Sequence, residues 1–209
     1  GIGPLTQQLC LGAKKVCAVE LDNRLKPILD ATVGEFDNLE IIWDDVLNQD
    51  VAALVAEKFA GLRPMACANL PYYITSPILS ALLEADCFDS VTVMVQKEVA
   101  LRLAADAGSK DYGAISVLTR YYTNPRIVTV VPADSFYPAP KVDSAVVCLE
   151  VLDKPNVDVK DEKMFFKVVK GAFSQRRKTL LNCLSSSFGI DKETAAEKIR
   201  NCGIEAGIR

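Results

Sequence analysis

The segment MACANLPYYITSPILSALLEADCFDSVTVMVQ, residues 65–96, carries the pattern that decides the fold. Two apolar runs, Met65–Ala68 and Val91–Val95, are typical of strands, and the pattern between them predicts a helix over Ile78–Glu84. We expect the Ser-Pro pair at 76–77 to begin this helix, with the serine as N-cap and the proline at the first helical position. Strands that are apolar throughout and separated by a helix favour a parallel sheet covered on both faces.

The same alternation extends to both sides of this segment. Earlier in the chain, two further β-rich runs predict strands at Val16–Val19 and Leu39–Trp43. Helical patterns are expected at Leu5–Leu11, Leu21–Ala31, Val51–Phe59 and Gln96–Ala105.

The pattern changes after residue 105. Arg126–Val131 and Ser144–Val151 read as two strands joined by a proline-punctuated loop. This loop is too short for a parallel crossover, so the two strands should pair antiparallel. From Glu162 onwards the pattern is helical. The sequence therefore predicts an α/β protein: an open, doubly wound, Rossmann-like sheet that is mostly parallel, an antiparallel strand pair at its end, and a small carboxyl-terminal helical domain.

Composition excludes several classes of enzyme. The 209 residues include no histidine, which excludes Ser-His-Asp and Cys-His catalysis and any histidine-ligated metal. The seven cysteines form no C-x-x-C pair, which favours reduced thiols in a cytoplasmic protein over a disulfide framework or a zinc site. No apolar run approaches the ~20 residues needed to span a bilayer, so we expect no membrane contact.

Charge divides the chain into two parts. Residues 1–152 carry 12 basic and 19 acidic side chains, whereas residues 153–209 carry 12 basic and 8 acidic ones. The polar segment 152–156, which contains Pro155, reads as a linker. We therefore expect one domain over 1–152 and a small basic domain over 153–209.

Polar residues follow the predicted strands at the end where an open α/β sheet binds its ligand. Gly1 and Gly3 precede the first predicted helix and would let a ligand approach the backbone closely. Glu20 and Asp45 each follow a strand, and an acid at that place can accept both hydroxyl hydrogens of a ribose. This grouping favours an adenosine-bearing cofactor, although each feature alone is also typical of a plain turn or a solvated loop acid.

Two details narrow the choice of cofactor. Thr6 stands where a dinucleotide-binding fingerprint has its third glycine, which disfavours NAD. The sequence also contains nothing that resembles a lysine-bearing phosphate loop, which disfavours ATP. S-adenosylmethionine, which has no phosphate, fits better.

The most specific local pattern is Asn69-Leu70-Pro71-Tyr72-Tyr73, directly after a predicted strand. The proline stiffens the turn, so an amide, exposed carbonyls and an aromatic ring are held together at the crevice. The Asn69 side-chain oxygen and the Leu70 carbonyl could accept the two hydrogens of an exocyclic amino group while Tyr72 stacks on the base. The proton can leave after methyl transfer, so no histidine is needed. The alternative is a Pro-Tyr turn that packs the end of the sheet.

Six blocks of sequence occur in order along nearly the whole chain. They are Gly1–Thr6, Val19–Asp22, Asn69–Ile74, Val95–Val99, Phe136–Ser144 and Phe173–Thr179. Together they resemble the ribosomal RNA adenine N6-dimethyltransferase family of the small ribosomal subunit. The resemblance implies a Rossmann-like methyltransferase that uses S-adenosylmethionine. Its implied reaction adds two methyl groups to each of two neighbouring adenines near the 3′ end of small-subunit ribosomal RNA, as part of ribosome biogenesis.

The same resemblance implies roles for individual residues. The implied cofactor-binding residues are Gly1, Gly3, Glu20, Leu21, Asp45, Val46 and Asn69. The implied catalytic residues are Asn69, Leu70, Pro71, Tyr72 and Phe136. Among them, Glu20 would bind the ribose hydroxyls and Asp45 the adenine amino group of the cofactor. Asn69 would hold N6 of the target adenine, and Phe136 would close on the base from the side opposite Tyr72.

Two departures from the family pattern affect these expectations. The family's cofactor motif begins one strand before Gly1, with an acid and a further glycine, and its amino-terminal Q-N-F-L-type segment is also missing here. The carboxyl end stops before the family's last helix is finished. We therefore expect a fragment trimmed at both ends that binds its cofactor poorly or not at all.

A net acidic enzyme that acts on RNA needs a local basic face, because phosphate contacts supply most of the sequence-independent affinity. The densest cluster of basic residues in the tail is Arg176, Arg177 and Lys178, and Lys163, Lys167 and Lys170 precede it on roughly one helical face. We expect the first three to bind small-subunit ribosomal RNA, in the form of an assembly intermediate, and the enzyme to act as a monomer. The alternatives are a solvated helix face for the three preceding lysines and a role for the arginines in docking the tail.

Two other functions stay open. The related Erm group methylates an adenine of large-subunit RNA, but the Q-R-R-K-T block and the proline loop favour the small-subunit enzyme. A ribosome-assembly or transcription factor could keep this fold without transferring methyl groups, although an intact N-L-P-Y block favours an active ancestor. Amino-methylating enzymes that act on DNA or on protein glutamine share an N-x-P-Y core and lack the later blocks.

Overall fold

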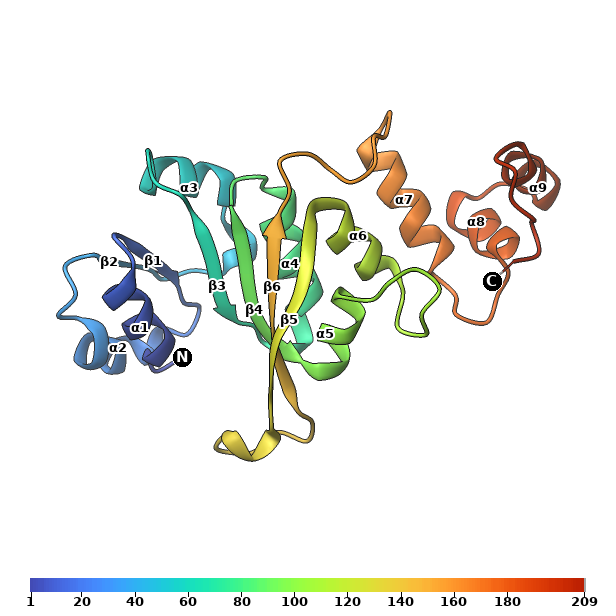
Figure 1. Ribbon diagram of the computed structural model, residues 1–209. Helices are drawn as coiled ribbons and strands as arrows, with labels where there is room; N and C mark the ends of the chain where they lie inside the picture. The colour runs from blue at the N-terminus through green and yellow to red at the C-terminus, as the bar shows by residue number, and fades with distance from the viewer. Residues whose placement is uncertain (209) are drawn as a thin grey trace. The chain divides into compact units, whose positions relative to one another are not determined.

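The computed structural model describes residues 1–208. Helices and strands alternate through the first two thirds of the chain, and helices follow to its end (Figure 1). Contacts between residues group the chain into two compact units. Unit 1 comprises residues 1–100 and 123–153, and unit 2 comprises residues 101–122 and 154–209.

The strands of unit 1 form two hydrogen-bonded sheets. A parallel pair consists of β1 (Val16–Val19) and β2 (Leu39–Ile42). The larger sheet has the order β3-β4-β6-β5, in which β3 pairs parallel with β4, and β6 pairs antiparallel with both β4 and β5 (Figure 1). Its strands are β3 (Met65–Asn69), β4 (Ser90–Gln96), β5 (Thr123–Val131) and β6 (Ser144–Val151).

The predicted fold class is confirmed, including the antiparallel pair at the end of the sheet. Two details differ from the prediction. The strands of residues 1–208 fall into two sheets instead of one. In addition, β5 begins at Thr123 and includes Pro125, which is tolerated because β5 is an edge strand and needs no ladder hydrogen bond on its outer side.

Short helices connect the strands of unit 1. They are α1 (Pro4–Gly12), α2 (Lys26–Val33), α3 (Val51–Lys58), α4 (Thr75–Glu84) and α5 (Lys97–Leu103), which continues into unit 2. Single 3-10 turns occupy 23–25, 46–48, 72–74 and 133–135. The predicted helix over Leu21–Ala31 therefore begins later, because Asp22 caps the turn at 23–25 and α2 starts only after it.

The predicted role of Ser76 as N-cap is wrong. Helix α4 begins at Thr75, one residue before it, and Ile74 stands at the N-cap position. The Thr75 hydroxyl donates a hydrogen bond to the Pro71 carbonyl at 3.1 Å, which joins the helix to the turn before it. Pro77 still lies in the first helical turn, where a missing N–H costs little because it would have no partner within the helix.

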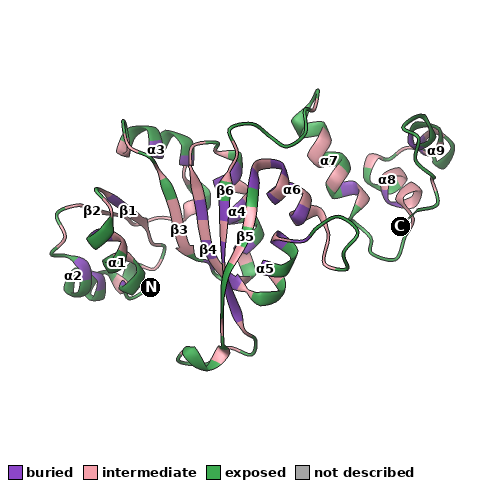
Figure 2. Cartoon of the chain, viewed as in Figure 1, coloured by how far each residue is buried: buried purple, intermediate pink, exposed green. Residues whose placement is uncertain are grey.

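The core of unit 1 is centred on two strands. Val91, Val93 and Val95 of β4 are completely buried. They lie opposite β6, whose alternate residues are also buried, as the purple bands on both strands in Figure 2 show. Leu79 and Leu83 of α4 are buried as well. At about 25 cal/mol per Å² of apolar surface removed from water, this central pair supplies much of the stability of the sheet.

Unit 2 is helical. Besides the end of α5 it contains α6 (Ala114–Tyr122), α7 (Glu162–Ala172), α8 (Leu180–Phe188) and α9 (Lys192–Asn201). The helical tail from Glu162 is as expected, whereas α6 is not among the predicted elements. The predicted division at residues 152 and 153 stays a prediction, and contacts group residues 101–122 with the carboxyl-terminal helices.

Aromatic side chains join α6 to α7 within unit 2. Tyr121 packs against the rings of both Phe165 and Phe166, at centroid distances of 5.3 and 5.1 Å. Both Tyr121 and Tyr122 donate hydrogen bonds to the Glu162 carboxylate, at 3.1 and 2.5 Å. Each tyrosine thus combines apolar packing with a satisfied hydroxyl group. None of the helices in residues 1–208 has both the length and the apolar character needed to span a bilayer.

Gly3 fixes the approach of α1 to α2. Its φ angle is +99°, a left-handed conformation that side chains disfavour. A Cβ atom at this position would lie 2.9 Å from Thr32 Oγ1 and 3.2 Å from Val33 Cγ1. Thr32 Oγ1 itself donates a hydrogen bond to the Ile2 carbonyl at 3.0 Å, so it could not move away without losing that bond.

We therefore expect Gly3→Ala to lower the free energy of unfolding by about 1–3 kcal/mol, measured by urea denaturation. Gly12→Ala is the matched control, because Gly12 ends the same helix and an added Cβ would have no atom within 4 Å. The control should be neutral or slightly stabilising. Equal stability of the two variants would contradict the close approach at Gly3.

Candidate functional site: the carboxyl ends of the parallel strands

The predicted cofactor residues of the first sheet lie at one edge. Register places Val19 opposite Ile42, so β1 and β2 end together. The Glu20 N–H then donates to the Ile42 carbonyl at 2.9 Å, which extends the ladder by one bond. The carboxylates that follow the two strands are therefore brought to the same edge, as the sequence predicted.

Glu20 lies beside the glycine segment. One of its carboxylate oxygens accepts a hydrogen bond from the Asp22 N–H at 2.9 Å, and the other lies 2.5 Å from the Gly1 nitrogen. Burial alone would raise the pKa of Glu20, whereas the hydrogen bond from the Asp22 N–H lowers it. Glu20 is therefore ionised at neutral pH and offers acceptors only. Leu21, which follows it, is exposed.

Asp45 is held at the start of a 3-10 turn. Its Oδ1 accepts the Leu47 N–H at 2.9 Å, and its own N–H donates to the side chain of Asp44 at 2.7 Å. Asp44 is fixed in turn by Gln49, whose amide donates to it at 2.6 Å. The second oxygen of Asp45 is left as an acceptor for a donor from outside. Val46, the next residue, is half-buried in the same turn.

The predicted target-binding segment lies at the carboxyl end of β3, in the larger sheet. Asn69 is the last residue of that strand and is exposed, and it lies opposite Met94 of β4. The Leu70 N–H donates to the Met94 carbonyl at 3.2 Å, and the Leu70 side chain is buried. Pro71 then starts the turn at 72–74. The backbone around Asn69 is thus held by the sheet on one side and by proline on the other.

The Tyr72 side chain has a defined partner. Its hydroxyl is 2.6 Å from the hydroxyl of Ser144, which is completely buried at the start of β6. A hydrogen bond between two hydroxyl groups at this distance fixes the direction of the Tyr72 ring. Ser144 is the last residue of the sequence block Phe136–Ser144, but the sequence alone indicates no role for it. Its role as a partner of Tyr72 follows from the strand register that brings β6 next to β4.

A loop between β5 and β6, residues 132–143, closes the site. Because β6 runs antiparallel to β4, Ser144 lies opposite Gln96, and the loop that precedes it reaches the edge where β3 and β4 end. Asp143 ties the base of the loop together. It accepts the Ala133 N–H at 3.2 Å, and its other carboxylate oxygen lies 3.5 Å from the Lys97 ammonium.

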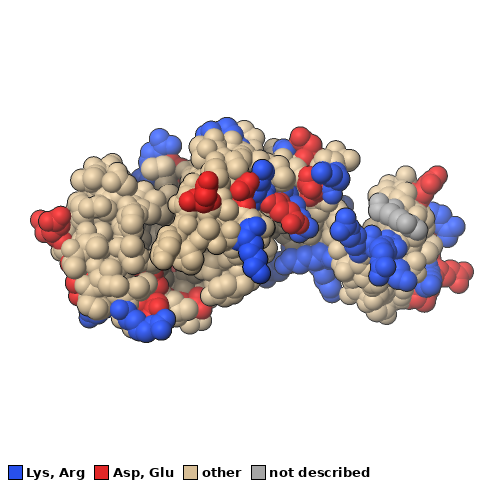
Figure 3. Space-filling view, turned by 90° about the horizontal axis from the view of Figure 1, so that it is seen from below, with Lys and Arg blue, Asp and Glu red and all other residues tan. Residues whose placement is uncertain are grey.

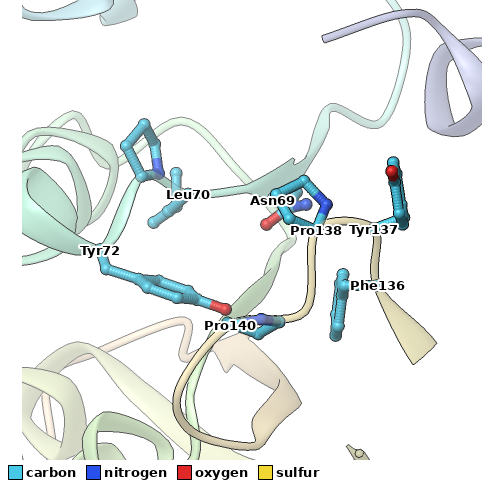
Figure 4. A pocket seen from close by; sticks show the side chains of 8 residues that line it. Asn69, Leu70, Tyr72, Phe136, Tyr137, Pro138 and Pro140 are labelled. Carbon is cyan, nitrogen blue, oxygen red and sulfur yellow. The ribbon is translucent and has the colours of Figure 1, made fainter. Parts of the chain in front are cut away.

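The two segments line one pocket of about 370 Å³. Its walls are Asn69, Leu70, Pro71, Tyr72, Phe136, Tyr137, Pro138 and Pro140. Figure 4 shows Tyr72 and Phe136 on opposite sides of the view, with the Asn69 amide between them. The pocket is mostly apolar with a few polar groups, which is the usual composition of a site for a small planar ligand. The structure thus brings together all five residues predicted as catalytic, and adds Tyr137, Pro138 and Pro140.

The cysteine nearest the predicted target-binding segment is not suited to act as a nucleophile. All seven are free thiols. Burial raises the pKa of Cys67 in β3, the strand that leads to Asn69, and also that of Cys10. A raised pKa keeps a thiol protonated and unreactive at neutral pH.

The predicted RNA-binding residues lie in unit 2. Arg176, Arg177 and Lys178 are exposed in the turn between α7 and α8. The Lys178 N–H donates to the Gln175 carbonyl at 3.1 Å, which closes the turn. Figure 3 shows Lys and Arg side chains gathered over the carboxyl-terminal helices on the face in view. This turn therefore presents several cations to solvent on a fixed backbone.

Comparison with known proteins gives consistent results. The family model described as ribosomal RNA adenine dimethylase matches residues 1–206. The protein "Ribosomal RNA small subunit methyltransferase A" of Alkaliphilus oremlandii is 50% identical over 100% of this chain and 74% of its own length. The protein of the same name from Geobacillus thermodenitrificans is 50% identical over 92% of this chain and 67% of its own length.

Two solved structures share the fold. A dimethyladenosine transferase from Plasmodium falciparum superposes with a TM-score of 0.70 at 24% identity, over 99% of this chain and 80% of that one. The 23S rRNA methyltransferase ErmE superposes with a TM-score of 0.68 at 24% identity, over 100% of this chain and 81% of that one. At this identity the likeness shows the fold alone.

Removal of the hydrogen bond between Tyr72 and Ser144 should lower the free energy of unfolding by a measurable amount. Tyr72→Phe leaves a completely buried hydroxyl without its partner, so we expect the free energy of unfolding to fall by about 1–3 kcal/mol in urea denaturation. Tyr73→Phe, a change at a neighbouring side chain that is 84% exposed, should have almost no effect. The double variant Tyr72→Phe with Ser144→Ala should lose less than the sum of the single losses. Strict additivity would argue against the bond.

Proposed function

The chain belongs to the ribosomal RNA adenine dimethylase family, and we propose that it transfers methyl groups from S-adenosylmethionine to N6 of two adjacent adenosines near the 3′ end of small-subunit ribosomal RNA. The resemblance inferred from the sequence blocks is confirmed, and the names of the relatives support an adenine dimethyltransferase activity. The observation that carries the proposed reaction is the single pocket that Asn69 lines together with the aromatic rings of Tyr72 and Phe136.

The acids of the first sheet suit S-adenosylmethionine as cofactor. Ribose hydroxyls and an adenine amino group are all donors, and the groups that follow β1 and β2 are carboxylate acceptors. In this proposal Glu20, with Leu21 beside it, holds the ribose, and Asp45, with Val46, holds the adenine of the cofactor. Gly1 and Gly3 pass along its methionine part. When bound, S-adenosylmethionine supplies an electrophilic methyl group on a positively charged sulfur.

Asn69 and Leu70 orient the acceptor nitrogen of the substrate. The amino group of adenine is a poor nucleophile because its lone pair is delocalised into the ring. Two acceptors, the Asn69 side-chain oxygen and the Leu70 carbonyl, bind its two hydrogens, which leaves the nitrogen lone pair free to face the methyl group of the cofactor. Leu70 and Pro71 contribute through a backbone that the sheet and the proline ring hold rigid. Positioning of this kind lowers the barrier without a general base.

Tyr72 and Phe136 hold the base between them. An adenosine within folded RNA must leave its stack to enter a protein pocket, and stacking on aromatic side chains offsets part of that cost. The Tyr72 ring is fixed by Ser144, and Phe136 is carried by the loop that Asp143 closes. The base therefore enters a slot whose walls are already in place.

The exposed cations of the turn between α7 and α8 suit the phosphate backbone of the RNA. Arg176, Arg177 and Lys178 are close in sequence, and none of them faces an ion-pair partner among residues 1–208. In this proposal they bind an assembly intermediate of the small subunit, and the enzyme acts as a monomer in the cytoplasm. Phosphate contacts of this kind give affinity that falls with salt.

One rival activity is methylation of large-subunit RNA, as the name of ErmE describes for that protein. The relatives at 44–50% identity are small-subunit methyltransferases, which favours the small subunit as the substrate of this chain. The other rival is an assembly factor that transfers no methyl group. Methyl transfer to unmethylated small subunits separates these readings, because only an active small-subunit enzyme gives the product.

Asn69→Ala should lower methyl transfer by about 100-fold or more, because the amino group loses its side-chain acceptor. The assay measures transfer of radiolabelled methyl groups from S-adenosylmethionine to unmethylated small subunits by the full-length protein and its variants, with N6,N6-dimethyladenosine identified after digestion. Asn201→Ala, at an exposed position in α9, is the control and should be fully active. Undiminished product from the Asn69 variant would remove this residue from the mechanism.

The double variant Arg176→Glu with Arg177→Glu should weaken binding to small subunits by about tenfold or more. It should also reduce the slope of log affinity against log salt by about 2, because two phosphate contacts are lost. Filter binding over a salt series measures both. Lys14→Glu with Lys26→Glu makes the same change in net charge on exposed residues of unit 1 and should have a much smaller effect. Equal effects of the two double variants would mean that only net charge matters.

A further inference from the structure

Tyr137 differs from the other two aromatic residues that line the base pocket, Tyr72 and Phe136, which are half-buried. Its side chain is fully exposed, with a relative exposure of 102%. Phe136, the residue before it, is half-buried in the same pocket. Figure 4 shows the two rings on different sides of the loop, so that Phe136 lies at the pocket and Tyr137 stands at its rim. A tyrosine side chain with no packing partner gains nothing from burial in the free protein.

The backbone that carries this ring is nevertheless restrained. The loop that carries it is closed at its base by the Ala133–Asp143 hydrogen bond, and the Phe136 N–H donates to the Ala133 carbonyl at 3.3 Å. Pro138 follows Tyr137 directly and removes one backbone freedom there. An exposed ring on a restrained backbone loses little conformational entropy when it binds a flat surface. This property is typical of the aromatic residues that anchor a binding partner.

The proposed substrate presents such a surface at this place. The two target adenosines are adjacent, so a nucleotide always neighbours the base that occupies the pocket. That neighbour has lost one stacking partner, because the target base has left the stack. Because this neighbour is joined directly to the base in the pocket, its exposed face would lie near the mouth of the pocket, where an aromatic side chain can replace the lost partner.

We propose that Tyr137 is a specificity-determining residue that stacks on the nucleobase next to the adenosine held in the pocket. The inference rests on the proposed function and extends it, since it concerns how a pair of adenosines is recognised. When the first adenosine leaves the pocket and the second enters it, the nucleotide near Tyr137 is again the one next to the bound adenosine in the RNA strand. One exposed ring thus serves both methylation sites.

Base-aromatic stacking predicts the size of the effect. We expect Tyr137→Ala to lower kcat/KM by about 5- to 100-fold on unmethylated small subunits, mainly through KM, because stacking contributes to binding of the substrate. Tyr137→Phe keeps the flat ring and should stay within about twofold of the wild type. The affinity for S-adenosylmethionine should be the same in all three proteins.

Coupling to the neighbouring base distinguishes stacking from a structural role. The substrates are small subunits reconstituted with RNA that lacks one base, either on the 5′ or on the 3′ side of a single target adenosine. On the substrate that lacks the stacked base, wild type and Tyr137→Ala should have equal kcat/KM. Tyr73→Ala, at an exposed tyrosine that does not line the pocket, should show no such coupling.

The outcomes separate the two proposals. A loss from Tyr137→Ala that is the same on all three substrates, or no loss on the intact one, would overturn the stacking role while the proposed function stands. All variants are made in the full-length protein, and failure of the full-length wild-type enzyme to methylate the intact substrate would instead overturn the proposed function. Coupling on one side only supports the inference and identifies which neighbour is bound.

Discussion

The hydrogen bond between the Tyr72 and Ser144 hydroxyls is the contact on which the geometry of the base pocket depends. It joins the turn after β3 to the first residue of β6, two segments separated by 72 positions in the chain. Because Ser144 is completely buried, it cannot exchange this partner for water, and the bond holds the tyrosine ring in one direction. The adjacent Asp143 closes the loop that carries Phe136, so neighbouring residues fix both walls of the pocket.

Local sequence predicted the elements whose pattern is strong. The strands at Val16–Val19 and Ser144–Val151 have the predicted bounds, and β4 extends its prediction by one residue at each end. Helix α6 was missed because its isoleucine, valine, threonine and tyrosines have no clear helical preference. Its helix depends instead on tertiary contacts, such as the Ser116 hydroxyl donating to the Arg102 carbonyl at 2.6 Å. Ser76 has the residue type of an N-cap, but the Thr75 hydroxyl bonds to the turn before it and α4 starts one residue earlier.

The candidate site was predictable residue by residue but not as a geometry. Asn69, Tyr72 and Phe136 were identified from their blocks, and the structure adds that they line one pocket. Pattern alone could not assign a partner to Ser144 or Asp143, because hydrogen bonds between residues far apart in sequence follow from sheet register. The sequence also could not predict that the Tyr137 side chain is exposed. An aromatic residue beside prolines has the same local pattern whether its ring is buried or exposed.

The reversed direction of β6 has a consequence for how such enzymes diverge. In a purely parallel sheet, the connection that precedes each strand meets it at the amino ends of the strands, away from the ligand. Here one inverted strand brings its incoming connection, residues 132–143, over the crevice. This connection can change in length or composition without the loss of a hydrogen bond between β5 and β6. The reason is that Val131 and Ser144, on either side of it, are the last paired residues of the two strands. Mutations in this one surface segment can therefore change which nucleic acid the enzyme binds, while the strands of the sheet stay the same.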